Sequence, residues 1–187
     1  MIQNGIRKIL ENHPLIPVVN ITNLDEVGPI CDLLIQRNIG CIELTLRSDV
    51  AIDAIKKAKK DFGSKLEIGV GTLINAAQVR TVQEIGVDFL VSPGSSSKLI
   101  DAMSKSGIPF IPGVMSPSEI IQGMEMGLNT FKLFPANIAG GLGALIAYKA
   151  VFSEVKFCPT GGISQENYKT ILDLENVISV GGSWLSK

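Results

Sequence analysis

The sequence predicts an α/β protein in which eight short strands form a closed parallel barrel, and two observations support this prediction. Apolar runs rich in β-branched residues alternate with helix-like segments along all 187 residues. The runs begin about 21 or 26 residues apart, which leaves room for one strand, one helix and two short loops in each repeat. Eight such units in succession are typical of a (β/α)8 barrel rather than of an open sheet.

Each expected strand is a short apolar run, and most of the runs end at a glycine, proline, serine or threonine. The eight strands are predicted at Leu15–Asn20, Cys41–Leu46, Glu67–Thr72, Asp88–Ser92, Pro109–Val114, Thr130–Pro135, Lys156–Thr160 and Val177–Gly181.

Helix-start signals follow several of these strands. Ser116 and Glu119 have the spacing of a capping box, and Pro117 between them occupies the first helical position. Asn75 and Ser95 stand where the N-caps of two further helices are expected.

The two ends of the chain depart from the regular repeat. Ile2, Ile6 and Ile9 have helical spacing, so we expect a short N-terminal helix that covers part of the barrel. Only residues 183–187 follow the last strand, and the eighth helix of a regular barrel is therefore expected to be lacking. No glycine- or serine-rich linker interrupts the pattern, which predicts a single domain over residues 1–187.

Composition excludes several classes of function. The chain has 17 Lys and Arg against 18 Asp and Glu, a balance that argues against binding nucleic acid. Its uncharged stretches are too short to span a membrane, and we expect neither a membrane partner nor a signal peptide. Three widely spaced cysteines fit a reducing compartment, which predicts a cytoplasmic protein. His13 is the single histidine, so we expect no metal site.

One strand offers a candidate acid/base. Apolar residues alternate with Glu43, Thr45 and Arg47, so these three are expected to face the barrel interior. A carboxylate in such a place is desolvated unless it has a partner, and a purely structural pair of Glu43 with Arg47 is equally compatible with this strand alone. Arg47 lies nearest the C-terminal rim, where barrel active sites form and where its planar fork suits a carboxylate or phosphate.

A second strand offers a candidate nucleophile. Lys132 stands between Phe131 and Leu133, which are expected to face the helices and to leave the amine inside. A buried lysine gives up its proton more readily, and the neutral amine is the nucleophile that forms a Schiff base with a carbonyl. Glu43 is the inward carboxylate expected at a similar height. The alternative is a buried ion pair of Lys132 with Glu43 that carries no chemistry.

Two glycine clusters follow the last two strands, at Gly161-Gly162 and at Gly181-Gly182-Ser183. Phosphate groups bind at this place in many barrels, because glycine lets backbone N–H groups approach the anion. The pair of clusters therefore predicts a phosphorylated ligand. Thr72 ends the third strand, and strict alternation places its side chain toward the helices.

With these residues assembled, the sequence closely resembles the bacterial family of 2-keto-3-deoxy-6-phosphogluconate (KDPG) aldolase, which also includes 4-hydroxy-2-oxoglutarate (KHG) aldolase activity. The segments that carry the resemblance are 42–47 (IELTLR), 69–72 (GVGT), 92–94 (SPG), 109–113 (PFIPG), 131–136 (FKLFPA), 158–164 (CPTGGIS) and 181–185 (GGSWL).

The resemblance implies a TIM barrel of the class I aldolase type, a homotrimer, and a metal-free and cofactor-free enzyme. The reaction implied is cleavage of KDPG, a phosphorylated 2-keto acid, to pyruvate and D-glyceraldehyde 3-phosphate, the last step of the Entner–Doudoroff pathway. By resemblance, the Schiff-base lysine corresponds to Lys132 and the acid/base to Glu43. The substrate contacts correspond to Arg47, Thr72, Pro93 and Phe134, and the phosphate contacts to Gly161, Gly162, Gly182 and Ser183.

The chain departs from the family at Asn137, where glutamate is common after Phe-Pro-Ala, and at its last helix. Three other functions remain open from the sequence: a KHG aldolase, a phosphosugar isomerase or epimerase on the same barrel, and a barrel that binds a phosphorylated ligand without turnover. The isomerase has no need of a lysine in mid-strand.

Overall fold

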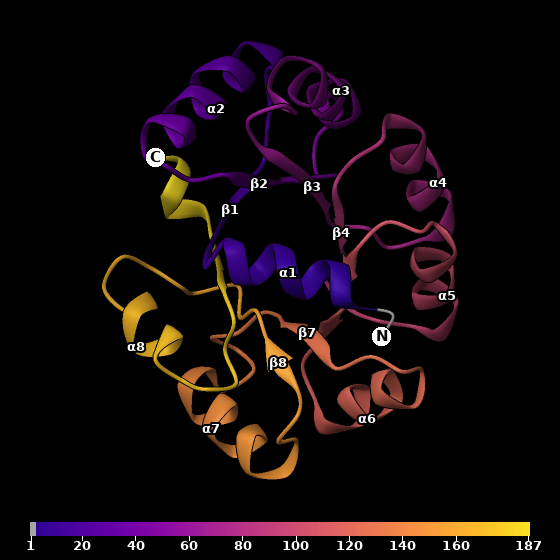
Figure 1. Ribbon diagram of the computed structural model, residues 1–187, viewed down its shortest axis with the longest axis vertical. Helices are drawn as coiled ribbons and strands as arrows, with labels where there is room; N and C mark the ends of the chain where they lie inside the picture. The colour runs from indigo at the N-terminus through magenta and orange to yellow at the C-terminus, as the bar shows by residue number, and fades with distance from the viewer. Residues whose placement is uncertain (1–2) are drawn as a thin grey trace.

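The computed structural model describes residues 3–187 and shows an α/β fold in which strands and helices alternate (Figure 1). The strands are β1 Leu15–Val19, β2 Cys41–Thr45, β3 Glu67–Gly71, β4 Phe89–Val91, β5 Phe110–Ile111, β6 Gly113–Val114, β7 Thr130–Leu133, β8 Lys156–Phe157 and β9 Val180–Gly182. The α-helices are α1 Asn4–Asn12, α2 Val27–Gln36, α3 Ala51–Phe62, α4 Ala76–Ile85, α5 Ser97–Lys105, α6 Pro117–Glu125, α7 Gly141–Val151 and α8 Tyr168–Leu172. Short 3-10 helices cover Leu24–Glu26 and Ser183–Ser186.

All the paired strands run parallel, in a curled sheet of order β5-β4-β3-β2-β1-β9 and a second sheet of order β6-β7-β8. Two bridges, Phe157↔Val177 and Thr160↔Gly181, connect the β8 side to the β9 side. The helices surround the strands on the outside (Figure 1). The predicted parallel, barrel-like α/β arrangement is therefore confirmed.

The strand predicted over residues 109–114 is divided into β5 and β6 at Pro112. Proline has no backbone N–H to donate to a ladder. The Pro112 carbonyl still accepts from the backbone N of Lys132 at 2.9 Å, so the chain passes from pairing with β4 to pairing with β7. The eighth predicted strand is also shorter than expected, because β9 begins at Val180 and Val177 contributes only an isolated bridge.

The alternation predicted for the strands is found in the packing. On β2 and β7 the residues Ile42, Leu44, Phe131 and Leu133 belong to the large apolar core between strands and helices. A smaller apolar cluster fills the lower barrel interior. Its members are Ile6, Ile9, Leu10, Ile16, Cys41, Phe89, Val91, Ile111 and Cys158.

Helix α1 lies across the middle of the ring in Figure 1, at the end where the strands begin. Its apolar face, Ile6, Ile9 and Leu10, is buried and joins the interior cluster. The expected N-terminal helix is thus present from Asn4 onward, while Ile2 lies outside the described residues. The helix covers the end of the barrel where the strands begin, which is called the lower end here, and it keeps water from the interior residues.

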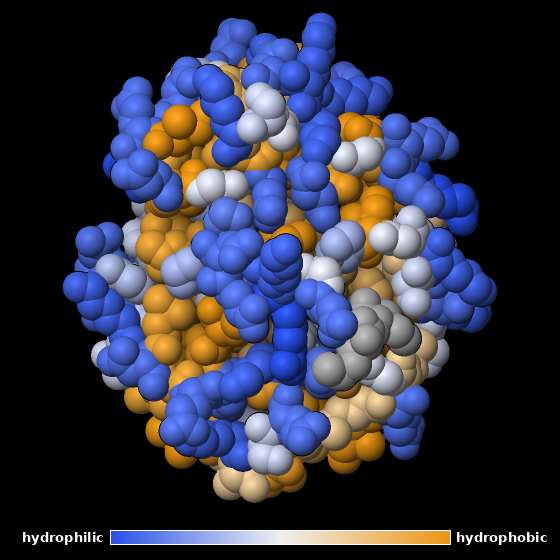
Figure 2. Space-filling view, in the orientation of Figure 1, coloured by the Kyte–Doolittle hydropathy of each residue, from blue (hydrophilic) through white to orange (hydrophobic). Residues whose placement is uncertain are grey.

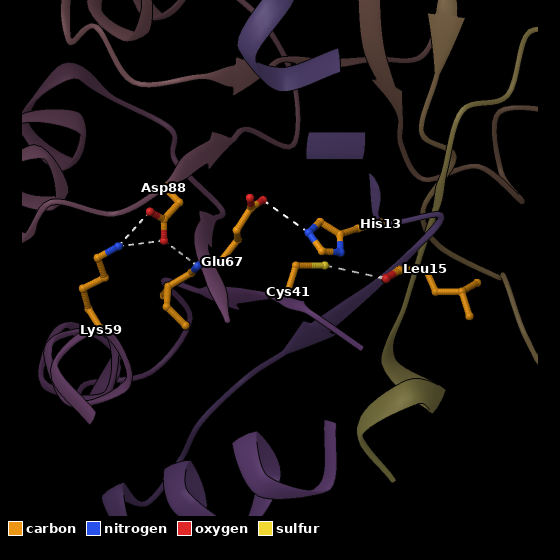
Figure 3. Close-up of polar contacts among 7 residues, drawn as sticks. His13, Leu15, Cys41, Lys59, Glu67 and Asp88 are labelled. Atoms are coloured by element: carbon orange, nitrogen blue, oxygen red, sulfur yellow. Dashed lines mark hydrogen bonds and ion pairs between the residues drawn. The ribbon is translucent and has the colours of Figure 1, made fainter. Parts of the chain in front are cut away.

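A set of polar contacts surrounds the beginnings of β2, β3 and β4 (Figure 3). Lys59 on α3 forms an ion pair with Asp88 at 2.7 Å, and Asp88 also accepts from the backbone N of Ile68 at 2.8 Å. His13 lies 3.4 Å from Glu67. These contacts give Lys59 and Asp88 partners at the lower rim, whereas Glu67 Oε2 is buried without a hydrogen-bond partner among the described residues. The contact of His13 with Glu67 indicates a structural role for His13.

Helix starts are well defined by their caps. Ser116 and Glu119 form the predicted capping box, and Asn75 accepts from Gln78 N at 3.0 Å. The predicted cap at Ser95 is wrong by one position: Ser96 accepts from Leu99 N at 3.2 Å. Three consecutive serines, 95–97, offer the same side chain, and only the backbone direction decides which one caps.

The surface is mostly polar over the outer helices, with apolar areas between them (Figure 2). Large apolar side chains are exposed on two neighbouring helices and their flanks, namely Ile121, Met124, Ile138, Leu142 and Ile146. No helix in the described part of the chain is long and apolar enough to cross a membrane.

The α6 capping box yields a stability prediction. Burial alone would raise the pKa of Glu119, but hydrogen bonds from Met115 N and from Ser116 lower it below its usual 4.5. A depressed carboxyl pKa stabilises the fold above the unfolded-state value, and this contribution is lost as the pH falls through the folded-state value. We expect Glu119→Gln to destabilise at pH 7 and to differ less from the wild type below about pH 4.5.

Ser116→Ala should lower the free energy of unfolding by about 1 kcal/mol at pH 7. Ser118→Ala, at an exposed position of the same turn, is the matched control and should change it little. Urea titrations over pH 3–8 check the expectations for Ser116 and for Glu119. A Glu119→Gln effect on the free energy of unfolding that stayed constant over this range would contradict the expectation for Glu119.

Candidate active site

Lys132 and Glu43 meet inside the barrel, each only 3% exposed. The Lys132 Nζ lies 2.9 Å from Glu43 Oε1 and 3.0 Å from Oε2. The amine comes from β7 and the carboxylate from β2, so strands 89 residues apart in sequence supply the two groups. The Phe134 ring also approaches the amine, with its centroid 5.4 Å from Nζ. The predicted proximity of amine and acid is confirmed by this geometry.

The absence of a side chain on the neighbouring strand leaves space for the Glu43 carboxylate. A Cβ placed on Gly71, its neighbour on β3, would lie 2.0 Å from Glu43 Oε1. No side chain larger than hydrogen leaves room for the carboxylate in its present position. Gly71 therefore determines where Glu43 meets Lys132.

Arg47 and Thr72 form a contact at the upper rim. The Arg47 Nε donates to Thr72 Oγ1 at 2.9 Å. Thr72 lies just beyond β3 with φ of +65°, in the left-handed region. This conformation ends the strand alternation, so Leu73 enters the core and Thr72 does not take the helix-facing place that strict alternation alone would give it. The hydroxyl of Thr72 holds the guanidinium at the mouth of the barrel instead.

A cavity of about 240 Å³ opens at this rim, at the ends of β1, β2, β7 and β9. Six of the residues predicted as site residues line it: Arg47, Phe134, Gly161, Gly162, Gly182 and Ser183. Thr45 lies two positions beyond Glu43 on β2, and Phe134 lies two positions beyond Lys132, just after β7, which places the cavity above the buried pair.

The two glycine clusters come together on one side of this cavity. Gly161 and Gly162 have φ of +96° and +73°, which glycine adopts without strain. The chain after β7 packs against them: Ala136 N donates to Thr160 O at 2.8 Å, and Asn137 N donates to Gly161 O at 3.1 Å. Gly182 and Ser183 complete this side from β9 and the 3-10 helix that follows.

Pro93 and Asn137 hold peripheral places. The Pro93 backbone lies against Gly113, where an added Cβ would come within 2.3 Å of it, and Pro93 does not line the cavity. Asn137 packs against Gly162, where an added Cβ would lie 2.4 Å from Asn137 Cβ. Asn137, where the family commonly has glutamate, therefore contacts the loop that contains Gly161 and Gly162.

Asn20 and Thr160 also line the cavity and were not singled out from the sequence. Thr45 Oγ1 contacts both Val19 O and Asn20 Oδ1 at 3.2 Å, which leaves the Asn20 amide group at the cavity wall. Both residues follow the end of a strand, and this position is the signal that would have found them.

The three cysteines are free and buried. Burial raises the pKa of the Cys31 thiol to about 11, and Asp32 adds to the effect. Burial likewise raises the pKa values of Cys41 and Cys158. A thiol so shifted stays protonated and is a poor nucleophile.

The family model for KDPG and KHG aldolases matches residues 6–187. The chain belongs to this family. The resemblance stated from the sequence motifs is therefore confirmed.

Relatives and solved structures agree with this membership. The KHG/KDPG aldolase of Escherichia coli K12 is 41% identical over 183 residues, which are 98% of this chain and 85% of the relative. The 2-dehydro-3-deoxy-phosphogluconate aldolase of Dickeya dadantii is 40% identical with the same coverage. A crystal structure of KDPG aldolase from Legionella pneumophila, with pyruvate captured as a covalent carbinolamine, has TM-score 0.92 and 44% identity over 95% of this chain and 86% of that one.

The KDPG aldolase of Zymomonas mobilis ZM4 has been solved with 3-phosphoglycerate. Its structure has TM-score 0.93 and 35% identity over 97% of this chain and 86% of that one.

The contact between Gly71 and Glu43 yields a prediction. Gly71→Ala should displace the Glu43 carboxylate from Lys132, and a misplacement of about 1 Å costs roughly 10²-fold in rate. We expect aldolase turnover to fall by about this factor while circular dichroism shows a folded chain. Gly28→Ala, where an added Cβ meets nothing within 4 Å, is the control and should keep its activity. Equal activities of the two variants would contradict the assigned contact.

Proposed function

We propose that the chain is a class I aldolase that cleaves KDPG to pyruvate and D-glyceraldehyde 3-phosphate, in the Entner–Doudoroff pathway. The observation that carries the proposal is the buried Lys132–Glu43 contact beneath a cavity lined by Arg47 and by two glycine clusters. Membership of the aldolase family favours this lyase over a phosphosugar isomerase on a similar barrel.

The geometry supports a Schiff-base mechanism. Transfer of a proton from Lys132 to Glu43 leaves a neutral amine, which attacks the C2 carbonyl of the substrate. Glu43 gives this proton to the carbinolamine hydroxyl, which leaves as water and yields an iminium, so that Glu43 is again a carboxylate. Glu43, as carboxylate, then takes the proton of the C4 hydroxyl, the C3–C4 bond breaks, and its electron pair enters the iminium to give an enamine. Protonation of the enamine at C3 and addition of water release pyruvate and restore the amine.

Arg47 and the glycine clusters divide the binding of the substrate. We assign the C1 carboxylate to Arg47 and Thr72, because a planar guanidinium binds a carboxylate with two hydrogen bonds. We assign the phosphate to Gly161, Gly162, Gly182 and Ser183, whose backbone N–H groups, together with the Ser183 hydroxyl, suit an anion. The phosphorylated three-carbon compound bound in the Zymomonas relative supports a phosphate site in this fold.

KHG aldolase is the second candidate function, and the dual name of the E. coli relative favours keeping it. The first product, pyruvate, is the same for both substrates, so Lys132 and Glu43 serve either reaction. The glycine clusters favour the phosphorylated substrate.

We also propose the finer description of the fold. In this description β5 and β6 are one strand divided at Pro112, the bridges to β9 close an eight-stranded ring, and residues 1–187 form one (β/α)8 domain. Free, buried cysteines support the proposed cytoplasmic location.

A Schiff base at Lys132 can be trapped chemically. We expect borohydride with pyruvate to add one reduced pyruvate adduct, located by peptide mass analysis at Lys132. Lys132→Ala should not be trapped and should lose turnover, while Glu43→Gln should slow turnover roughly 10²- to 10⁴-fold.

Lys156→Ala is the control for the trapping experiment, since this lysine opens β8 and contacts the Glu175 carbonyl at the lower rim. It should be trapped as readily as the wild type. An adduct on Lys156, or the absence of an adduct on the wild type, would contradict the proposed reaction.

The two substrates are distinguished by a variant of the phosphate side. Ser183→Ala removes one hydrogen bond to a charged group, so kcat/KM for KDPG should fall roughly 10- to 100-fold. Its kcat/KM for KHG and its trapping with pyruvate should change little. A similar loss for both substrates would place the phosphate elsewhere.

We propose a homotrimer, supported by exposed apolar side chains on α6 and α7 such as Ile121 and Ile146, which are 49% and 54% exposed. Sedimentation equilibrium should give three times 20.0 kDa for the wild type. The double variant Ile121→Lys/Ile146→Lys should dissociate, whereas Ile74→Lys, at an isolated exposed position, should not. A monomeric wild type would refute this assembly.

A further inference from the structure

Gln3 makes an unusually complete set of contacts at the bottom of the barrel. Its side chain is only 2% exposed. Its amide nitrogen donates to Thr130 O at 2.8 Å and to Phe110 O at 3.3 Å. Its amide oxygen accepts from Asn129 N at 2.9 Å and from Thr130 N at 2.8 Å. Both donors and both lone pairs of the amide are thereby used on backbone groups, three of them where β7 begins and one on β5.

Arg7, one helical turn further along α1, contacts the same place. Its Nε donates to Thr130 Oγ1 at 3.0 Å, and its Nη2 donates to Asn129 O at 3.2 Å and to Glu154 O at 3.1 Å. Thr130 itself is fully buried. The side chains of Gln3 and Arg7 therefore form hydrogen bonds with both the backbone and the hydroxyl of Thr130.

Thr130 stands two positions before Lys132 on β7. The two side chains share the inward face of the strand, about 7 Å apart along it. Any shift or rotation of the strand at Thr130 is therefore carried to the Lys132 amine.

The strands that carry the two catalytic groups are supported unequally. Glu43 lies in β2, which pairs with β3 over five residue pairs from Cys41↔Glu67 to Thr45↔Gly71. Lys132 lies in β7, and its neighbours β6 and β8 pair with it over two residue pairs each. The ladder alone fixes β7 less firmly than β2, and Gln3 and Arg7 add five hydrogen bonds to Asn129 and Thr130 at its beginning.

We propose that Gln3 and Arg7 are positioning residues for the Lys132 amine. Through Thr130 they set the height and direction of β7, so that Nζ reaches both carboxylate oxygens of Glu43. The inference rests on the proposed function, because it concerns the amine that captures the substrate ketone. Neither residue touches the substrate cavity.

The test measures imine formation with pyruvate in single turnover, together with its pH profile, kcat and KM. Arg7→Ala and Thr130→Val break the same hydrogen bond from its two ends. We expect each to slow imine formation about tenfold with KM for the substrate little changed, and to displace the pH profile of that step. Arg7→Ala also removes the bonds to Asn129 O and Glu154 O. Because the shared bond can be lost only once, the double variant should be slowed by less than the product of the two single effects.

Thr130→Ser keeps the hydroxyl and should restore the wild-type rate and pH profile. Lys8→Ala, which removes an exposed basic side chain from the same helix, is the matched control and should behave as the wild type. If Arg7→Ala does not fold, the nearly isosteric pair Thr130→Val and Thr130→Ser decides.

A purely structural role predicts a different result. The variants would then melt at lower temperature but would show wild-type imine rates and pH profiles well below their Tm, and that outcome would overturn the proposal. A wild-type chain that forms no imine with pyruvate would instead refute the proposed function.

Discussion

The site depends on a pair of opposite charges held out of water by the barrel. Each charge alone would be costly to bury, and the pair is tolerated because the amine meets both oxygens of the carboxylate at 2.9 and 3.0 Å. The same closeness makes the pair reactive. A single proton transfer over this distance converts an ion pair into a neutral amine and a neutral acid, which are the two forms that attack on a ketone requires.

The surroundings of the pair serve this transfer in different ways. Helix α1 and the apolar cluster above it exclude water from below. Gly71 leaves room for the carboxylate, and the Phe134 ring covers the amine at the side of the cavity. The cavity opens at the rim above the pair, with Arg47 in its wall.

Much of this arrangement follows from local sequence. The alternation of Phe131, Lys132 and Leu133 predicts an inward amine, since a strand has a period of two whatever its neighbours are. Glu43 follows in the same way. The direction of the Thr72 side chain cannot be predicted in this way, because its left-handed backbone breaks the alternation at the point where the strand ends.

Contacts between distant segments could not be read from the sequence. The hydrogen bonds of Gln3 span 107 to 127 residues, and nothing near residue 3 indicates that its partner is the backbone of Thr130. The same limit applies to Asn20, whose place at the cavity depends on how β1 and β2 are aligned. Position along a strand is a local property, whereas register between strands is set by the whole fold.

The reactive amine and the glycine clusters are also linked through the backbone, and this linkage bears on specificity. The chain that leaves β7 after Lys132 donates from Ala136 and Asn137 to the carbonyls of Thr160 and Gly161. The distance between the amine and the phosphate side is therefore fixed by the fold rather than by flexible side chains. A substrate is cleaved efficiently when its ketone and its far anion are separated by that distance. Because Asn137 packs against Gly162, a change at position 137 would act on this spacing without touching the lysine.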